Sequence, residues 1–300
     1  MTFSYRDETK DLNELTRREA SGSFVQLSQG VTHYELSNPE AAHTVVLVHG
    51  FSIPYFVYDP TFAFLSQAGF RVLRYDLFGR GYSDRPDLHY NIDLFVRQLI
   101  DLLDALHCTR PVSLVGLSVG GPIVAATTAR FPERVDKLVL IDPVGAKPFT
   151  LSRLLKIATK PGLGEGLTGV VASVRVAKWI ANSPLDREQI GEFGPRYISQ
   201  MEYKGFKRAV LSTIRNNMLD SFLDVYEQIG NMGKPVLLFW GRNDHTVPFK
   251  HSKRLQRVMP QMEFHPIENC GHMPHYEKPE EVNPILLKFL NKTFSQDNRF

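Results

Sequence analysis

Short apolar runs alternate with longer amphipathic stretches along most of the chain. Residues 44–48 (TVVLV) form a continuous apolar run, which is typical of a strand buried on both faces of a sheet. Residues 91–107 instead carry apolar side chains at helical spacing. The strand pattern appears in eight segments, at 23–27, 31–36, 44–48, 70–75, 111–115, 135–141, 235–240 and 262–266. Their alternation with helical segments predicts an α/β fold, with a mostly parallel eight-stranded sheet flanked by helices.

The alternation stops between residues 144 and 230, where the pattern predicts helices and turns but no strand. A helical block of this size between the sixth and seventh strands predicts an inserted cap rather than a second independent domain. Residues 1–22 are polar and predict an extension on the surface. The core of the fold is therefore expected in two pieces of the chain, 23–143 and 231–300.

Composition excludes several classes of protein. The 300 residues are 43% hydrophobic and 22% charged, which excludes a wholly disordered chain and allows a sizeable core. A net charge of +3 without a dense Lys/Arg stripe argues against nucleic acid as a partner. Two cysteines are too few for a disulfide framework or a metal cluster. Because the sequence has neither an apolar run of about 18 residues nor an apolar signal core, we expect a cytoplasmic protein without a membrane span.

The motif Gly116-Leu-Ser-Val-Gly120 gives the strongest indication of chemistry. It stands between a predicted buried strand and a predicted helix, where a Gly-x-Ser-x-Gly motif exposes its serine at a sharp turn. Such a turn crowds the backbone, and Gly116 and Gly120 relieve that crowding. The N-terminus of the following helix supplies free N–H groups for a developing oxyanion. Ser118 is therefore the candidate nucleophile.

A serine hydroxyl needs a base, and the base needs a third group to hold it. Asp244 follows the predicted strand at 235–240, and His272 follows the last predicted strand. Both therefore belong to loops at the carboxyl edge of the sheet, where the sites of open α/β sheets gather. The order Ser118, Asp244, His272 is the nucleophile–acid–base order of one class of hydrolase.

The acid and the base each have alternatives in the sequence. Asp142 also ends a strand, although we expect it to cap the start of the inserted region. His275 lies three residues after His272, and His245 neighbours the candidate acid. Gly271 favours His272 as the base, because a glycine there allows a tight turn that aims the ring inward.

Taken together, these segments resemble the α/β-hydrolase superfamily, in its capped branch of serine esterases and monoacylglycerol lipases. The resemblance runs from about residue 24 to residue 294. It rests on five features in family order: His49-Gly50, the stretch Asp76-Leu-Phe-Gly79-Arg-Gly81-Tyr-Ser83, the serine turn, the Asp244 loop and Cys270-Gly-His272.

The resemblance implies an oxyanion hole made of two backbone N–H groups. One belongs to Val119, the residue after the nucleophile, and the other to Phe51, the residue after the His-Gly pair. The resemblance implies neither a metal nor an organic cofactor. It gives His49 a structural role. In the Asp76–Ser83 segment, we expect Asp76 to accept backbone hydrogen bonds and Arg80 or Arg85 to pair with carboxylates.

A serine nucleophile indicates an acyl-enzyme and a carboxylic ester, thioester or amide substrate. Related dehalogenases and epoxide hydrolases carry an aspartate at that position. We therefore expect a carboxylesterase or acylglycerol lipase acting on a small-molecule ester with an apolar acyl group. One alternative is a carbon–carbon bond hydrolase of ring-cleavage products, although such members carry a tryptophan where Met273 stands here. The others are a cofactor-free haloperoxidase-like activity and a non-enzymatic receptor, which would lack a triad position.

Within the predicted cap, residues 151–160 interleave apolar and cationic side chains. This pattern predicts an amphipathic cationic helix, which would allow transient contact with a lipid surface and guide acyl chains to the site. The alternative is that the apolar face of this helix packs on the core.

Overall fold

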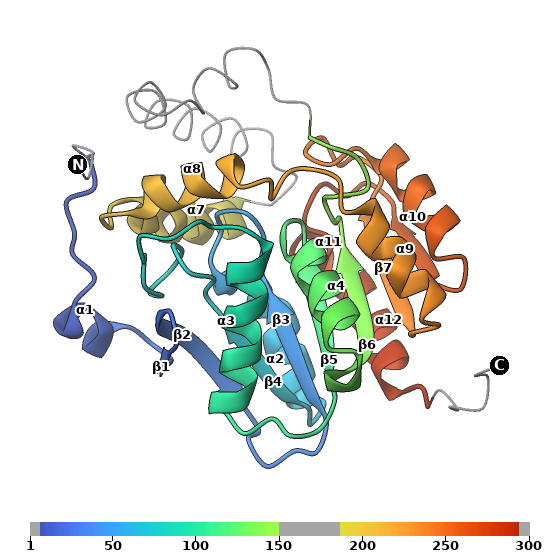
Figure 1. Cartoon of the computed structure of the whole chain (residues 1–300), viewed down its shortest axis with the longest axis horizontal. Helices are drawn as coiled ribbons and strands as arrows, with labels where there is room; N and C mark the ends of the chain where they lie inside the picture. Colours follow the sequence, from blue (N-terminus) through green and yellow to red (C-terminus); the bar gives the residue numbers. More distant parts are fainter. Residues whose placement is uncertain (1–6, 150–186, 294–300) are drawn as a thin grey trace.

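The computed structural model describes residues 7–149 and 187–293, and one eight-stranded sheet forms its centre (Figure 1). The strand order is β1-β2-β4-β3-β5-β6-β7-β8. β2 pairs antiparallel with β1 and with β4, whereas every other neighbouring pair is parallel. The strands are β1 (Ser23–Leu27), β2 (Gly30–Ser37), β3 (Thr44–Val48), β4 (Arg71–Tyr75), β5 (Val112–Leu117), β6 (Val135–Ile141), β7 (Val236–Gly241) and β8 (Glu263–Ile267). The predicted fold class is confirmed.

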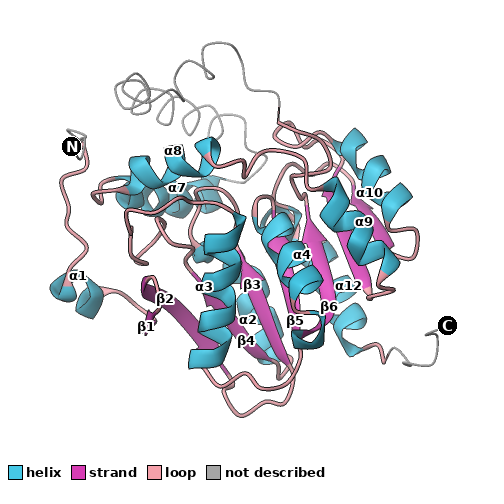
Figure 2. Ribbon diagram, viewed as in Figure 1, coloured by secondary structure: helices cyan, strands magenta, loops and turns pink. Residues whose placement is uncertain are grey.

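Helices cover both faces of the sheet (Figure 2). One face carries α3, α4, α9 and α10, and the other carries α2 and α12. The helices of the described ranges are α1 (Glu14–Glu19), α2 (Asp59–Gln67), α3 (Ile92–Ala105), α4 (Gly120–Arg130), α7 (Arg187–Met201), α8 (Phe206–Arg215), α9 (Leu223–Asn231), α10 (Ser252–Val258), α11 (Pro274–Glu277) and α12 (Pro279–Asn291). The sheet is therefore the middle of three layers.

The continuous apolar run of β3 is explained by burial on both sides of the sheet. Val46 and Val48 belong to the apolar cluster beneath α3 and α4, whereas Val45 and Leu47 belong to the cluster beneath α2 and α12. Successive side chains of a strand point to opposite faces, so a central strand needs apolar residues at every position. Burying apolar surface in this way stabilises the folded state by about 25 cal/mol for each Å² removed from water.

The observed elements differ from the predicted ones mainly at their ends. α4 begins at Gly120 rather than at residue 118, because Ser118 has a left-handed backbone with φ +54°. The sequence does not predict α2, whose residues DPTFAFLSQ show no clear helical stripe. α9 lies within the range predicted as a cap, yet it packs against α4 and α10 on the sheet face.

The N-terminal segment lies against the beginning of α8. Glu8 is buried, and its two carboxylate oxygens accept hydrogen bonds from the backbone N–H groups of Gly205 and Lys207, both at 2.7 Å. The backbone N–H of Lys10 donates to the carbonyl of Glu202 at 2.9 Å. Since the first N–H groups of a helix have no partner within the helix, Glu8 caps α8 from a distant part of the chain.

α7 and α8 lie above the carboxyl ends of the parallel strands (Figure 1). Tyr197 of α7 donates a hydrogen bond to the hydroxyl of Ser52, at 2.8 Å. Thr213 of α8 accepts one from Arg80, also at 2.8 Å. These two helices lie within the range 144–230 that the sequence predicts as a cap, and the predicted amphipathic segment at 151–160 lies outside the described residues.

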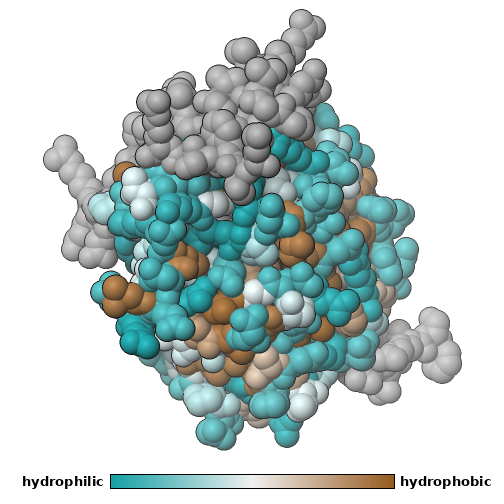
Figure 3. Space-filling view, turned by 60° about the vertical axis from the view of Figure 1, so that its left-hand side comes forward, coloured by the Kyte–Doolittle hydropathy of each residue, from teal (hydrophilic) through white to brown (hydrophobic). Residues whose placement is uncertain are grey.

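Polar side chains cover most of the described surface in the view of Figure 3, and apolar side chains form smaller groups among them. Among the described residues, the most exposed large apolar ones are Leu15 and Ile198, at 65% and 51%. Within the described ranges, no helix combines the length and the apolar character that crossing a membrane requires.

Candidate active site

Ser118 forms the turn between β5 and α4. Its φ of +54° lies in the left-handed region, which a residue with a Cβ adopts at an energetic cost. Its backbone N–H donates to the carbonyl of Ile141 at 2.9 Å, and its carbonyl accepts from the N–H groups of Gly121 at 3.0 Å and Val144 at 3.1 Å. Val119 follows as the N-cap of α4. This is the strained strand-to-helix turn that the sequence motif predicts.

Glycines allow this turn to pack against the end of β3. A Cβ on Gly116 would lie 2.5 Å from the carbonyl oxygen of Gly120, and a Cβ on Gly120 would lie 2.3 Å from that of Val48. Both separations are far below van der Waals contact, so larger residues would displace α4 from the sheet. A Cβ on Gly50 would lie 3.2 Å from the Cβ of Ser118. The segment after β3 is therefore a direct neighbour of the serine.

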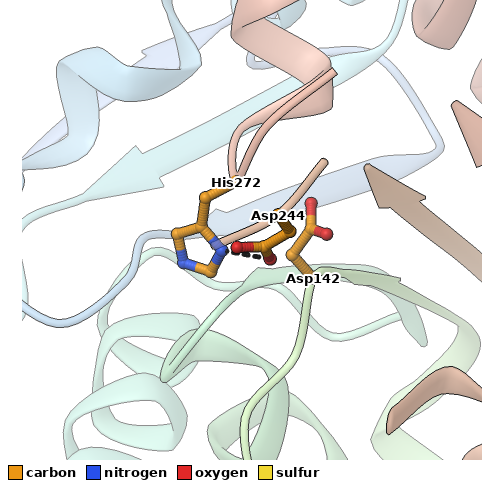
Figure 4. A group of neighbouring side chains, drawn as sticks. All are labelled: Asp142, Asp244 and His272. Atoms are coloured by element: carbon orange, nitrogen blue, oxygen red, sulfur yellow. Dashed lines mark hydrogen bonds and ion pairs between the residues drawn. The ribbon is translucent and has the colours of Figure 1, made fainter. Parts of the chain in front are cut away.

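Asp244 and His272 form a hydrogen-bonded pair (Figure 4). Nδ1 of His272 lies 2.7 Å from Oδ2 of Asp244. An ionised carboxylate only accepts hydrogen bonds, so Nδ1 carries the proton and Nε2 is left as a base. Oδ1 of Asp244 accepts from the backbone N–H groups of Thr246 at 2.7 Å and Val247 at 2.9 Å. The side chain of Asp244 is fully buried, whereas that of His272 is 14% exposed.

The two alternative bases have other surroundings. His275 is fully buried, with its ring against Tyr58 at 4.6 Å between centroids. Burial lowers the pKa of His275 to about 3, so this imidazole stays neutral at ordinary pH. His245 is exposed to solvent. Of these three described histidines, the one that pairs with Asp244 is His272.

The expected role of Asp142 as a cap for the inserted region is wrong. Asp142 also has a left-handed backbone, with φ +42°, which turns its side chain across the sheet edge. Its Oδ1 accepts a hydrogen bond from the backbone N–H of Gly241, at the end of β7, at 3.0 Å. Its carboxyl group therefore lies beside Asp244 (Figure 4).

His49 orients the peptide that carries one of the predicted oxyanion donors. Its Nε2 accepts from the backbone N–H of Leu77 at 2.9 Å, so the proton is on Nδ1, which donates to the carbonyl of Gly50 at 2.9 Å. Burial lowers the pKa of His49 to about 4 and keeps it neutral. In a trans peptide the C=O and N–H bonds point in opposite directions, so this contact also sets the direction of the Phe51 N–H.

Arg80 joins the segment after β3 to α8. Its guanidinium is buried and donates to the carbonyls of Phe51 at 2.8 Å and Phe78 at 3.1 Å, and to the hydroxyl of Thr213 at 2.8 Å. Burial lowers its pKa to about 10, which still leaves it charged at neutral pH. Arg85 likewise donates to backbone carbonyls. The expected carboxylate partners of these arginines are therefore wrong within the described chain.

Glu277 holds the loop of His272, a contact that the sequence analysis missed. Its Oε2 accepts from the backbone N–H of Gly271 at 2.6 Å, and its Oε1 accepts from that of Met273 at 2.9 Å. These are the residues directly before and after His272. The sequence indicates this contact through the spacing of four residues between Met273 and Glu277. Residues four apart lie one helical turn from each other, so the Glu277 side chain can reach the backbone at Met273.

Asp142, Asp244 and His272 are the described residues whose ligand atoms come close enough to hold a metal ion. These atoms all lie within 4.8 Å of one another. However, the Asp244 oxygen and the His272 nitrogen already share a hydrogen bond, and a metal on Nδ1 would have to displace that proton. The observed geometry is therefore that of an acid–base pair.

Comparison with known proteins identifies related sequences over most of the chain. Residues 45–285 match a family described as the alpha/beta hydrolase family. A 2-hydroxymuconate semialdehyde hydrolase from Pseudomonas putida is 30% identical over 253 residues, which are 82% of this chain and 86% of that protein. Carboxylesterase YbfK from Bacillus subtilis is 26% identical over 277 residues, which are 91% of this chain and 88% of that protein.

A solved structure shows the same fold. The crystal structure of carboxylesterase CesB (YbfK) from Bacillus subtilis superposes with a TM-score of 0.76. The two chains are 24% identical, and the superposition covers 92% of this chain and 93% of the other. The relatives therefore include proteins named for ester cleavage and proteins named for cleavage of a semialdehyde.

Proposed function

Because the chain belongs to the alpha/beta hydrolase family, we propose that it is a serine hydrolase that cleaves carboxylic esters through an acyl-enzyme on Ser118. Asp244 and His272 complete the proposed triad. The substrate is a small-molecule ester with an apolar acyl group. One observation carries the proposal: the left-handed Ser118 turn and the buried Asp244–His272 pair stand at the carboxyl edge of the same sheet.

Backbone contacts connect the serine turn to the acid–base pair. The backbone of Ser118 is hydrogen-bonded to the backbones of Ile141 and Val144, which lie before and after Asp142 in the chain. Asp142 in turn has its carboxyl group within 4.8 Å of the ligand atoms of Asp244 and His272. This short path supports the proposed approach of the imidazole to the serine hydroxyl.

In the proposed mechanism, Nε2 of His272 takes the hydroxyl proton while Oγ of Ser118 attacks the ester carbonyl. Asp244 holds the Nδ1–H tautomer and stabilises the imidazolium. The N–H groups of Phe51 and Val119 bind the oxyanion, and losing one such donor costs roughly 10²–10³ in rate. His272 then protonates the leaving alcohol and afterwards activates the water that hydrolyses the acyl-enzyme.

The test is hydrolysis of p-nitrophenyl esters by the wild-type protein and by Ser118→Ala. We expect turnover by the wild type, an initial burst of nitrophenol when deacylation is slow, and a loss of at least about 10³-fold in Ser118→Ala. A serine-directed phosphonate should label the wild type alone. Ser113→Ala is a suitable control, because Ser113 is a buried serine of β5, the strand that precedes Ser118, and it bonds to His43 instead. Ester hydrolysis that survives in folded Ser118→Ala would overturn the proposal.

The second candidate is hydrolysis of a carbon–carbon bond in a ring-cleavage product. The 30% identity to 2-hydroxymuconate semialdehyde hydrolase favours it, whereas Met273 after the candidate base departs from the tryptophan expected in that group. Dienoic keto acids and short p-nitrophenyl esters, assayed side by side, separate the two candidates. Activity confined to the keto acids would replace the ester proposal while keeping Ser118 as its nucleophile.

The length of the acyl group distinguishes an esterase from a lipase. A series of esters from acetyl to long-chain acyl, with and without lipid vesicles, measures this preference. An upturn in rate with long chains at vesicle surfaces would support an acylglycerol lipase and the predicted lipid contact of the cap. A maximum at short chains without any vesicle effect would support a carboxylesterase.

A further inference from the structure

Asp142 is a buried acid that the proposed mechanism does not use. It follows β6 directly, and its exposed fraction is 0%. Its left-handed φ of +42° is a conformation that asparagine and aspartate tolerate better than other residues with a Cβ. A strained, water-excluded position for a charged residue type indicates a specific role for its side chain.

The two carboxylate oxygens of Asp142 differ in their partners. Oδ1 accepts the hydrogen bond from the backbone N–H of Gly241. Oδ2 is buried and meets no hydrogen-bond donor in the described chain. A carboxylate oxygen of Asp142 lies within 4.8 Å of one of Asp244, whose carboxylate also only accepts hydrogen bonds. Two ionised carboxylates in this buried position would repel each other.

One proton on either carboxyl group removes this repulsion. The hydrogen-bond donors around each group determine which one carries the proton. Asp244 receives three N–H donors, from Thr246, Val247 and the ring of His272. Asp142 receives one. Hydrogen bonds to the ionised form stabilise it, so Asp244 is the carboxylate and Asp142 is the acid. Consistently, burial and the neighbouring Asp244 raise the pKa of Asp142 well above its usual range.

We propose that Asp142 is a positioning residue, a neutral carboxylic acid whose Oδ2–H donates a hydrogen bond to Asp244 and so holds that carboxylate against His272. The proton gives Oδ2 of Asp142 the partner it lacks and gives Asp244 a fourth donor. Asp244 is then fixed from both sides, by Asp142 directly after β6 and by His272 of the loop after β8 (Figure 4). This inference rests on the proposed serine chemistry, since it assigns a support to the same triad.

Asparagine reproduces this arrangement without a titratable proton. Its Oδ1 accepts from Gly241 N–H as before, and its Nδ2–H donates to Asp244 in place of the acid proton. Alanine removes both contacts and leaves an accepting carboxylate with one donor fewer. A hydrogen bond to a charged group is worth about 10- to 100-fold, which sets the expected size of the effect.

The test compares kcat and KM for Asp142→Asn, Asp142→Ala and the wild type on a p-nitrophenyl ester. We expect Asp142→Ala to lose about 10- to 100-fold in kcat with little change in KM, and Asp142→Asn to retain most of the activity. An equal loss in both variants would overturn the proposal, because an ionised Asp142 predicts that result. Unchanged activity in folded Asp142→Ala would overturn it as well.

Infrared spectroscopy gives a readout that is independent of activity. A neutral carboxylic acid has a carbonyl stretch apart from the amide bands, so the spectrum of the wild type minus that of Asp142→Asn should contain this band at neutral pH. Its absence would overturn the proposal even if Asp142→Ala fails to fold. The band should persist in Ser118→Ala. If Ser118→Ala keeps full activity while the band is present, the proposed function fails and the neutral acid stands.

Discussion

Ser118 and Asp142 directly follow the neighbouring strands β5 and β6, and both have left-handed backbones, with φ of +54° and +42°. Such conformations cost of order 1–3 kcal/mol each for residues other than glycine. They persist here because hydrogen bonds tie them to the sheet, from Ser118 to Ile141 and from Asp142 to Gly241. The strain thus falls on two residues that present polar groups to the same sheet edge.

Asp142 should make the stability of the protein depend on pH. Its raised pKa, caused by burial and then by Asp244, means that the folded chain holds a proton that the unfolded chain has lost. The free energy of unfolding should therefore fall as pH rises above the ordinary aspartate pKa, by about 1.4 kcal/mol per pH unit, until Asp142 ionises. Urea unfolding of the wild type and of Asp142→Asn at about pH 5, 6 and 7 should show a growing advantage for the variant. A constant difference would contradict a neutral Asp142.

His49 should affect the rate without touching the substrate. His49→Leu removes the donor that fixes the Gly50 carbonyl, so the Phe51 N–H is free to turn away from the oxyanion. We expect kcat to fall by at least about tenfold, with the loss of a whole oxyanion donor, roughly 10²–10³, as the upper bound. His43→Leu is the matched control, because His43 bonds to Ser113 at the opposite end of β3. Equal rates in the two variants would contradict this role.

At the scale of elements, the sequence predicts strands better than the turns between them. β3 and β6 are found at the predicted residues, since β3 is buried at every position and β6 is apolar and buried from Leu138 to Ile141. The sequence does not predict α2, because Phe62 and Phe64 pack against the core while only partly buried, and Thr61 is one of the two buried residues, so no single apolar stripe marks the helix. α4 starts at Gly120 because Ser118 has a left-handed backbone, a turn that the Gly-x-Ser-x-Gly motif predicts but that the spacing of apolar residues alone does not locate.

The loop between β8 and α11 should lose its geometry when Glu277 changes. Glu277→Gln keeps one acceptor but places an amide N–H against a backbone N–H, which breaks one of the two contacts beside His272. We expect kcat to fall by about tenfold, with KM nearly unchanged, since one hydrogen bond to a charged group is lost. Glu280→Gln, an exposed change on α12, is the control. Loss of activity in both variants would point to a general effect of charge.

At the scale of the whole molecule, the sequence locates the candidate triad but not its supports. Ser118, Asp244 and His272 each follow a strand in a parallel sheet, and topology alone brings such positions to one edge. Asp76 was also predicted as an acceptor of backbone hydrogen bonds, and it accepts from Tyr55 and Tyr82. The partners of Asp142 and Arg80 depend on side-chain packing between distant segments, which periodicity does not encode.

Arg80 should hold α8 to the core. Arg80→Met leaves the acceptors on Phe51, Phe78 and Thr213 without their donor, so we expect the free energy of unfolding to fall by at least about 2 kcal/mol. Limited proteolysis should also cleave faster near α8. Arg71→Met is the control, because it removes one hydrogen bond, to the carbonyl of Leu106, far from α8. It should lower the free energy of unfolding by less and leave proteolysis near α8 unchanged. Equal rates of proteolysis in the two variants would contradict the role of Arg80 in holding α8 to the core.

Glu8 reaches α8 across 199 positions of sequence, counted to Lys207. During synthesis the ribosome releases Glu8 well before its binding site on α8 has been made. Closing so long a loop is entropically costly until both ends are held by other contacts. The cap on α8 therefore belongs among the last steps of assembly, and a fusion partner attached before Glu8 would act on that step more than on formation of the sheet.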